Sequence, residues 1–293
     1  MYYFYSILSF SLLTQLAASI FFPAYGIVFG VKSRASGGLN VSSPPSVLYT
    51  FEEDGSNFSE IGILTLSGTA IDVDGLAISR DFGLIGFHVK QNQSQLLSID
   101  PLTAVTTAIG DPILGREIRG ATFDLQENLL TIDVTENELI SIDPLSGAIL
   151  NQLSLSEDIR NPTDIAVDLD GNFFVSSSSK VSSLNRETGI LSDVFIDPSL
   201  AYAGITFSEV EGNSKIFGYE INSTDDVFSL TLPEFNRSTV YSHIIPRFNS
   251  GRGDLASVLP TQPINEPSGS VPEPSTLLGL ISLLSLARVF NRQ

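Results

Sequence analysis

Two stretches of the chain nearly copy each other: "QLLSIDPLTAVTTAIG" at residues 95–110 and "ELISIDPLSGAILNQL" at residues 138–153. Each places a short apolar run on either side of an Asp-Pro pair, which predicts a strand, a turn and a second strand. The Asp side chain bonds nearby backbone N–H groups and the Pro presets φ, so the pair suits a type I turn. The chain is therefore expected to consist of repeated β-hairpins.

Two looser copies of this hairpin follow further along the chain. The first, "KVSSLNRETGILSDVF" at residues 180–195, replaces Asp-Pro by another turn of the same length, Asn-Arg-Glu-Thr-Gly. The second is "DVFSLTLPEFNRSTVYSHI" at residues 226–244. The sequence thus predicts four related hairpins.

Each hairpin is preceded by two more short strands. The first of them begins with a small or acidic residue, as in "GLAIS" (75–79), "GATFD" (120–124), "DIAVD" (164–168), "GITFS" (204–208) and "DLASV" (254–258). Their starts are 45, 44, 40 and 50 residues apart. Between each of the first four and its hairpin lies one more strand, "LIGFH", "LLTID", "NFFVS" or "KIFGY". Four short strands repeating at a period of about 45 residues are typical of a β-propeller blade.

The last of these strands, at 254–258, has no blade after it. The three strands that it lacks are expected near the N-terminus, in "GIVFGV" (26–31), "VLYTF" (47–51) and "SEIGIL" (59–64). One blade is then split between the two ends of the chain, which closes the ring and removes its free edges. We expect an all-β propeller of five four-stranded blades over residues 25–260, with a divergent sixth blade in 32–46 as the alternative.

The repeats resemble those of the NHL/WD-like repeat propellers that are often found in exported proteins. The resemblance spans most of residues 25–260 and implies the architecture. Because one propeller fold serves many functions, it implies no activity.

The N-terminal stretch is apolar. Residues 1–31 contain no charged side chain, which indicates a secretory signal or a membrane anchor. We predict a signal peptide at 1–24, cleaved after Ala24, with Ala18 as the other candidate. An uncleaved anchor and a buried core segment are the alternatives. The strand expected at 26–31 favours a mature protein that starts near Tyr25.

The other end of the chain has its own order of parts. A Pro-rich linker at 261–271 leads into a tail at 272–293, whose apolar run covers 277–287. As a helix this run rises about 17 Å, against about 30 Å for the hydrocarbon core of a bilayer. It is too short for a good permanent span, but with arginines snorkelling at its end it suits temporary insertion. We therefore expect an apolar helix at each end of the precursor.

The tail resembles the PEP-CTERM sorting domain of exported bacterial proteins. The resemblance rests on "VPEPST", the Leu/Gly-rich run and the terminal arginines. It implies that an exosortase-type membrane protease recognises Pro272, Glu273, Pro274, Arg288 and Arg292. It also implies a transient inner-membrane anchor, removal of the tail, release to the cell envelope or exterior, and an association with exopolysaccharide. The alternative is a C-terminal helix that packs on the domain.

Composition narrows the functional classes. The formal net charge of −18 repels phosphate backbones, so nucleic-acid binding is not expected. The chain has no cysteine, which excludes disulfides, thiolate metal sites and Cys nucleophiles. His88 and His243 are the only histidines. Two histidines leave almost no side chains for a zinc site or for histidine-based acid–base chemistry.

Residues at the start of the innermost strands are the candidate binding site. Asp74, Arg119, Asp164 and Asp254 are expected to line one mouth of the central channel. Such a mixed ring suits a cation, a sugar or an acidic ligand. The alternative is that these side chains satisfy loop amides and solvate the mouth.

One segment looks like part of a calcium loop. "DLDGN" at 168–172 has the right beginning, but an EF-hand loop needs Glu at its twelfth position, which is Ser179 here. A hairpin turn is the simpler interpretation.

The sequence favours a non-enzymatic exported propeller that acts as a binding module at the cell surface or in the extracellular matrix. Its expected ligands are exopolysaccharide or a surface protein. No catalytic residue, metal ligand or cofactor is predicted, and no Gly-x-Ser-x-Gly nucleophile elbow is present. The alternatives are an exported calcium-dependent hydrolase or lactonase with carboxylates at the channel, and a permanently anchored envelope protein.

Overall fold

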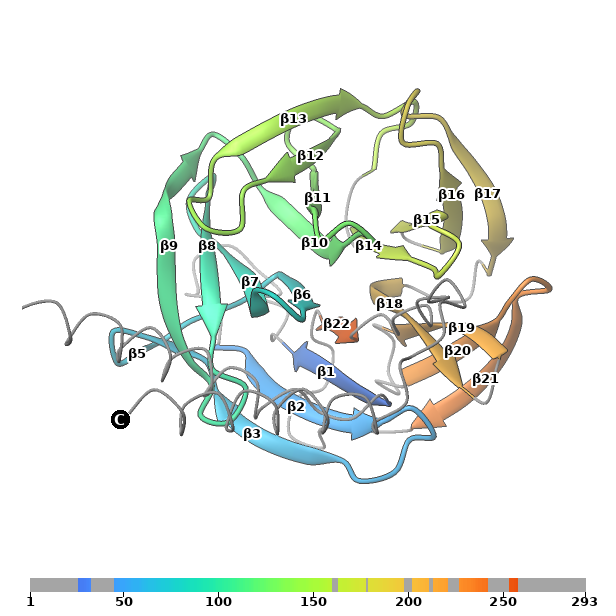
Figure 1. The fold of residues 1–293 in the computed structure, drawn as a ribbon, viewed down its shortest axis with the longest axis horizontal. Coiled ribbons are helices and arrows are strands. Elements are labelled where there is room, and N and C mark those ends of the chain that lie inside the picture. Colours follow the sequence, from blue (N-terminus) through green and yellow to red (C-terminus); the bar gives the residue numbers. More distant parts are fainter. Residues whose placement is uncertain are drawn as a thin grey trace, which may run out of the picture. The chain divides into compact units, whose positions relative to one another are not determined.

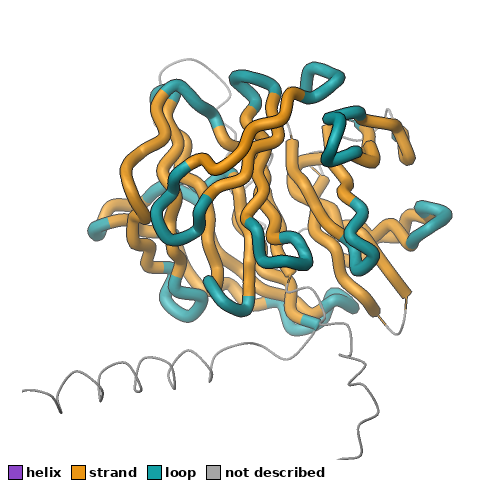
Figure 2. Tube along the Cα trace, turned by 45° about the horizontal axis from the view of Figure 1, so that its top comes forward, coloured by secondary structure: helices purple, strands orange, loops and turns teal. Residues whose placement is uncertain are grey.

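The computed structural model describes residues 26–32, 45–159, 163–177, 179–197, 202–210, 213–220, 227–241 and 253–257. The chain divides into two units, residues 1–260 and 261–293. The predicted signal peptide, linker and sorting tail lie outside the described residues. Within the described ranges every regular element is a strand (Figure 2), and no helix there is long and apolar enough to cross a membrane.

Five sheets surround a common axis in the first unit (Figure 1). The first blade contains β22 (Gly253–Ser257), β1 (Ile27–Lys32), β2 (Val47–Glu52) and β3 (Ser59–Ile63). The second contains β6 (Gly75–Ser79), β7 (Gly83–Val89), β8 (Gln93–Ile99) and β9 (Val105–Leu114). The third contains β10 (Ile118–Phe123), β11 (Leu129–Asp133), β12 (Glu138–Ile142) and β13 (Ile149–Ser154).

The last two blades follow the same order. The fourth contains β14 (Thr163–Val167), β15 (Phe173–Ser177), β16 (Lys180–Leu184) and β17 (Leu191–Ile196). The fifth contains β18 (Tyr202–Val210), β19 (Asn213–Glu220), β20 (Val227–Thr231) and β21 (Asn236–Tyr241). Figure 1 shows β6, β10, β14, β18 and β22 nearest to the axis and the last strand of each blade at the rim. The predicted five-bladed propeller is confirmed.

The first blade is closed by strands from opposite ends of the chain. β22 pairs antiparallel with β1, with Val31 opposite Asp254 and Phe29 opposite Ala256. β1 then pairs with β2 in a continuous antiparallel register. The predicted split blade is confirmed, and the strand expected at 26–31 is β1, Ile27–Lys32.

The second blade carries two strands that the repeat pattern did not predict. β4 (Thr65–Leu66) pairs parallel with the outer strand β9, and β5 (Thr69–Ala70) pairs with β4. This hairpin covers the outer edge of the second blade. Strands of two residues have no periodicity of their own, so no pattern in the sequence predicts them.

The Asp-Pro turns have the predicted chemistry. The Asp100 carboxylate accepts the N–H of Leu102 at 2.8 Å, and that of Asp143 accepts the N–H of Leu145 at 3.0 Å. The loop after Asp100 closes where the N–H of Ala104 donates to its carbonyl oxygen. Four-residue hairpin loops of this kind are most often built around a type I turn.

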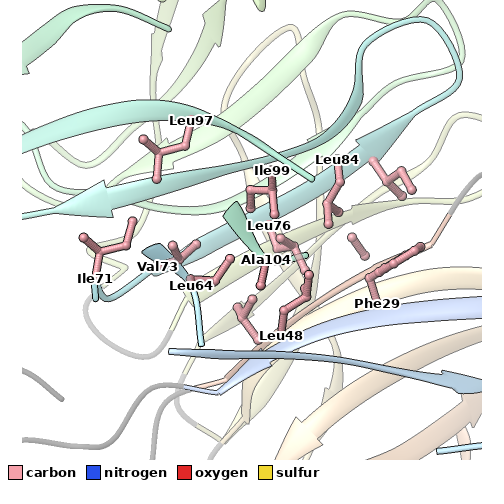
Figure 3. Close-up of a cluster of buried hydrophobic side chains, with 13 residues drawn as sticks. Phe29, Leu48, Leu64, Ile71, Val73, Leu76, Leu84, Leu97, Ile99 and Ala104 are labelled. Atoms are coloured by element: carbon pink, nitrogen blue, oxygen red, sulfur yellow. The ribbon is translucent and has the colours of Figure 1, made fainter. Parts of the chain in front are cut away.

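The hydrophobic core lies between neighbouring blades. In one cluster, Leu76, Leu84 and Leu97 of the second blade pack with Phe29 and Leu48 of the first (Figure 3). Similar clusters join the third blade to the second and to the fourth, and the fifth to the fourth and to the first. Each sheet is thus buried on both faces, which explains the apolar runs in its inner strands.

Candidate functional site

The five inner strands meet most closely at one residue from each blade. These residues are Gly75 on β6, Gly120 on β10, Asp164 on β14, Gly204 on β18 and Asp254 on β22, and we call them the axial ring. A Cβ added to Gly120 would lie 2.4 Å from the Cα of Asp164, and one on Gly204 would lie 2.4 Å from the Cα of Asp254. The glycines therefore leave the space that the two Asp residues occupy.

The carboxyl group of Asp164 joins three inner strands. Its Oδ1 accepts the N–H of Ala121 on β10 at 3.1 Å and that of Ile165 on its own strand at 2.7 Å. Its Oδ2 accepts the N–H of Ile205 on β18 at 2.6 Å. Asp164 has no exposed surface. One buried side chain thus connects the third, fourth and fifth blades.

Asp254 does the same for the remaining two blades. Its Oδ1 accepts the N–H of Leu255 on its own strand at 2.8 Å, and its Oδ2 accepts the N–H of Leu76 on β6 at 2.5 Å. The residue is 2% exposed. In the described part of the chain each inner strand is the last of its sheet, so these amides have no strand beside them. A buried N–H without an acceptor is costly, and two carboxyl groups supply acceptors for five of them.

The two carboxyl groups lie near each other, because Gly204 packs against Asp254 and the next residue, Ile205, donates its N–H to Asp164. Burial raises the pKa of Asp164 to about 7, while the hydrogen bonds from Asp254 and three amides act in the opposite direction. Burial, and then the negative charge of Asp164, raises the pKa of Asp254 well above its usual range. Asp164 accepts more amide hydrogen bonds, so it ionises first and Asp254 keeps its proton longer.

This arrangement suits a negative charge at the axis better than a cation. Five N–H dipoles point their positive ends at the same two carboxyl groups. A calcium ion needs several oxygen ligands with free lone pairs, and these oxygens already accept hydrogen bonds. The donor set at Asp164 and Asp254 therefore does not fit a calcium ion. Among the residues that the structure describes, no group of three or more His, Asp or Glu side chains is arranged to hold a metal.

The other two predicted site residues lie one position before the axial ring. Asp74 precedes Gly75, and its backbone N–H donates to the carbonyl oxygen of Phe87. Arg119 precedes Gly120, is 8% exposed, and contacts Glu117 through Nη2 at 3.3 Å. The structure brings Asp164 and Asp254 together at the axis. A role of the four residues in ligand binding stays a prediction.

The sequence shows small or acidic residues at the start of the inner strands but predicts no role for the glycines of the axial ring. Three of the five inner strands begin their apolar run with Gly and two with Asp, at the same position of the repeat. That alternation was visible in the sequence. Its meaning depends on which strands become neighbours, because each ring Asp needs a residue without a side chain beside it.

The segment at 168–172 is a hairpin turn, as predicted. The Asp168 carboxylate accepts the N–H groups of Asp170 at 3.0 Å and Asn172 at 2.7 Å, and the turn joins β14 to β15. Asp124 makes the same bonds to Gln126 and Asn128 in the preceding blade. Both carboxylates therefore serve the turn itself.

Comparisons with known proteins support the fold and no more. A structural genomics protein of unknown function from Bacteroides thetaiotaomicron has a TM-score of 0.51 at 14% identity, over 79% of this chain and 63% of that one. Virginiamycin B lyase from Staphylococcus aureus has a TM-score of 0.42 at 12% identity, over 73% of each chain. No family model matches the chain, and no curated protein matches its sequence.

Proposed function

We propose that this chain is an exported propeller that binds a ligand at the cell surface or in the extracellular matrix without turning it over. The proposal rests on the observation that the two axial carboxyl groups bind backbone amides of the fold itself. They are the ionisable groups that five strands bring together, and the fold uses them to hold its own backbone amides. A carboxyl group buried in this way is not accessible to a substrate.

Export is supported by the two ends of the sequence. The apolar segment before residue 26 suits a signal peptide, and Pro272-Glu273-Pro274 with the following apolar run and arginines suits processing by an exosortase-type membrane protease. The net charge of −18 disfavours polyanionic ligands. Neutral exopolysaccharide or a basic surface protein is therefore the ligand class that we favour.

Processing is tested by mapping both ends of the protein recovered from the envelope and medium of its native host. The predicted mature form starts near Tyr25 and ends near Pro272–Ser275. Glu273→Ala should abolish removal of the tail. Glu266→Ala is the matched control, because it changes a Glu-Pro pair seven residues upstream and should leave processing intact. Intact Met1 and Gln293 in the wild type would contradict the export proposal.

Binding is tested by cosedimentation of the mature protein with polysaccharide isolated from the same host. We expect saturable binding and no change in the size distribution of the polysaccharide on long incubation. Release of shorter saccharides would contradict the non-enzymatic proposal. Absence of binding would point to a protein ligand, which crosslinking in intact cells would then identify.

The calcium-dependent hydrolase is separated from this proposal by a melting experiment. Because the axial donor set does not fit a calcium ion, millimolar calcium should leave the Tm of the mature protein unchanged apart from a general salt effect. Magnesium at the same ionic strength is the control. A rise in Tm specific to calcium would favour the hydrolase.

A further inference from the structure

We propose that Asp164 and Asp254 form a proton-dependent clasp, which holds the five inner strands together while the pair keeps a proton and weakens the closing strand β22 when that proton leaves. The clasp joins blades that are far apart in the sequence. Asp254 lies on the strand that closes the ring, and its Oδ2 accepts the Leu76 N–H of the next blade. Closure of the ring therefore depends on the state of this one carboxyl group.

The geometry makes a fully ionised pair unfavourable. The two carboxyl groups are buried and contact the adjacent residues Gly204 and Ile205, so two negative charges would lie near each other in a medium of low dielectric. Five amide donors stabilise one such charge well. A proton kept by the pair removes the second charge.

Other charged groups near the pair come from three elements. Asp74 precedes β6, Arg119 lies beside Gly120 on β10, and Lys32 on β1 is paired with Gly253 of the closing strand. On β15, the residue opposite Asp164 is Ser176, whose hydroxyl oxygen accepts the Asp164 N–H at 3.1 Å. On β19, the residue opposite Ile205 is Gly218. Neither of these two facing residues carries a charge.

The direction of the pH dependence follows from the raised pKa values. In the unfolded chain an Asp has a pKa of about 3.9, so both groups lose their protons below pH 5. In the folded protein the pKa of Asp164 is about 7 and that of Asp254 is higher than its usual range. Between the unfolded and the folded pKa values, the folded state therefore binds more protons than the unfolded state. The stability that the pair contributes is fully present below the unfolded pKa and is lost as pH rises through the folded pKa values.

The test compares the wild type with Asp254→Asn between pH 5 and pH 7 by urea unfolding. Asn carries no titrating proton, so the ratio of the wild-type unfolding constant to that of the variant should rise about tenfold per pH unit. Asp164→Asn should give the same pH dependence. Asp111→Asn, at an exposed position on β9, is the control and should give a constant ratio. A constant ratio for both axial variants would overturn the proposal.

A second measurement keeps the proposal testable if the axial variants do not fold. Infrared spectroscopy in D2O at pH 6.5, with Asp164 and Asp254 unchanged, should show the C=O band of a protonated carboxylic acid. A Glu127→Gln background is used because burial also raises the pKa of Glu127. Absence of the band in this background would overturn the proposal. Its loss on raising the pH, together with faster hydrogen exchange of the Leu76 amide, would support it.

Discussion

Replacing Gly120 by Ala tests the packing of the axial ring. Gly120 has φ +67°, a left-handed conformation that costs an L-residue about 1–2 kcal/mol. Its new Cβ would also lie 2.4 Å from both the Cα and the Oδ1 of Asp164, so the Asp backbone would have to move. Movement of Asp164 weakens its bonds to three buried amides, and each amide left without an acceptor costs about 1–3 kcal/mol. We expect Gly120→Ala to lower the free energy of unfolding by about 4–6 kcal/mol.

Gly115→Ala is the matched control for this substitution. Gly115 has φ +75°, and no atom lies within 4 Å of the position its Cβ would take. It therefore carries the conformational cost alone, about 1–2 kcal/mol. Urea unfolding of both variants at pH 6, with the m-value compared between them, measures the difference. If Gly120→Ala cost no more than Gly115→Ala, the close packing of the axial ring would be refuted.

Two further predictions concern buried charges. Asp164→Ala leaves three buried N–H groups without an acceptor and should lower the free energy of unfolding in urea by about 3–6 kcal/mol. Asp254→Ala leaves two such groups and should lower it by about 2–4 kcal/mol. A larger loss for Asp254→Ala would contradict the assignment of the amides. Arg116→Gln removes the ion pair to Asp133, whose side chain is fully buried, and should cost about 2–3 kcal/mol. Arg186→Gln is its control, because Arg186 is about half exposed while its partner Asp124 is buried like Asp133, and it should cost less than about 1 kcal/mol. Equal losses would show that the exposure of the arginine does not decide the contribution of the pair.

The sequence was sufficient for the architecture because a propeller is specified blade by blade. Each hairpin signal, such as Asp143-Pro144, is local, and its repetition at a nearly fixed period shows how many blades follow. The split blade could be predicted because three strands were missing at one end and present at the other. The hairpin β4–β5 could not be predicted, because its pairing with β9 depends on contacts distant in sequence.

The candidate site was only partly predictable for the same reason. Asp164 and Asp254 stood out as acidic residues at the start of inner strands, but the amides that they hold are buried and belong to inner strands, whereas the alternative named loop amides at a solvated mouth. The two carboxyl groups accept amides from all five blades, and this depends on how five strands distant in sequence approach one another. The bulge at Gly120, which places Ala121 against Asp164, has no signal in the local pattern either.

Amide hydrogen exchange of the five inner-strand N–H groups shows whether the two axial carboxyl groups hold the inner strands. These groups belong to Leu76, Ala121, Ile165, Ile205 and Leu255 and lie on strand edges that face the axis. If two buried carboxyl groups hold them, they should exchange only through global unfolding, as slowly as amides in the middle of a blade. Exchange within minutes under native conditions, as expected for a free strand edge, would show that the axial carboxyl groups do not hold these amides.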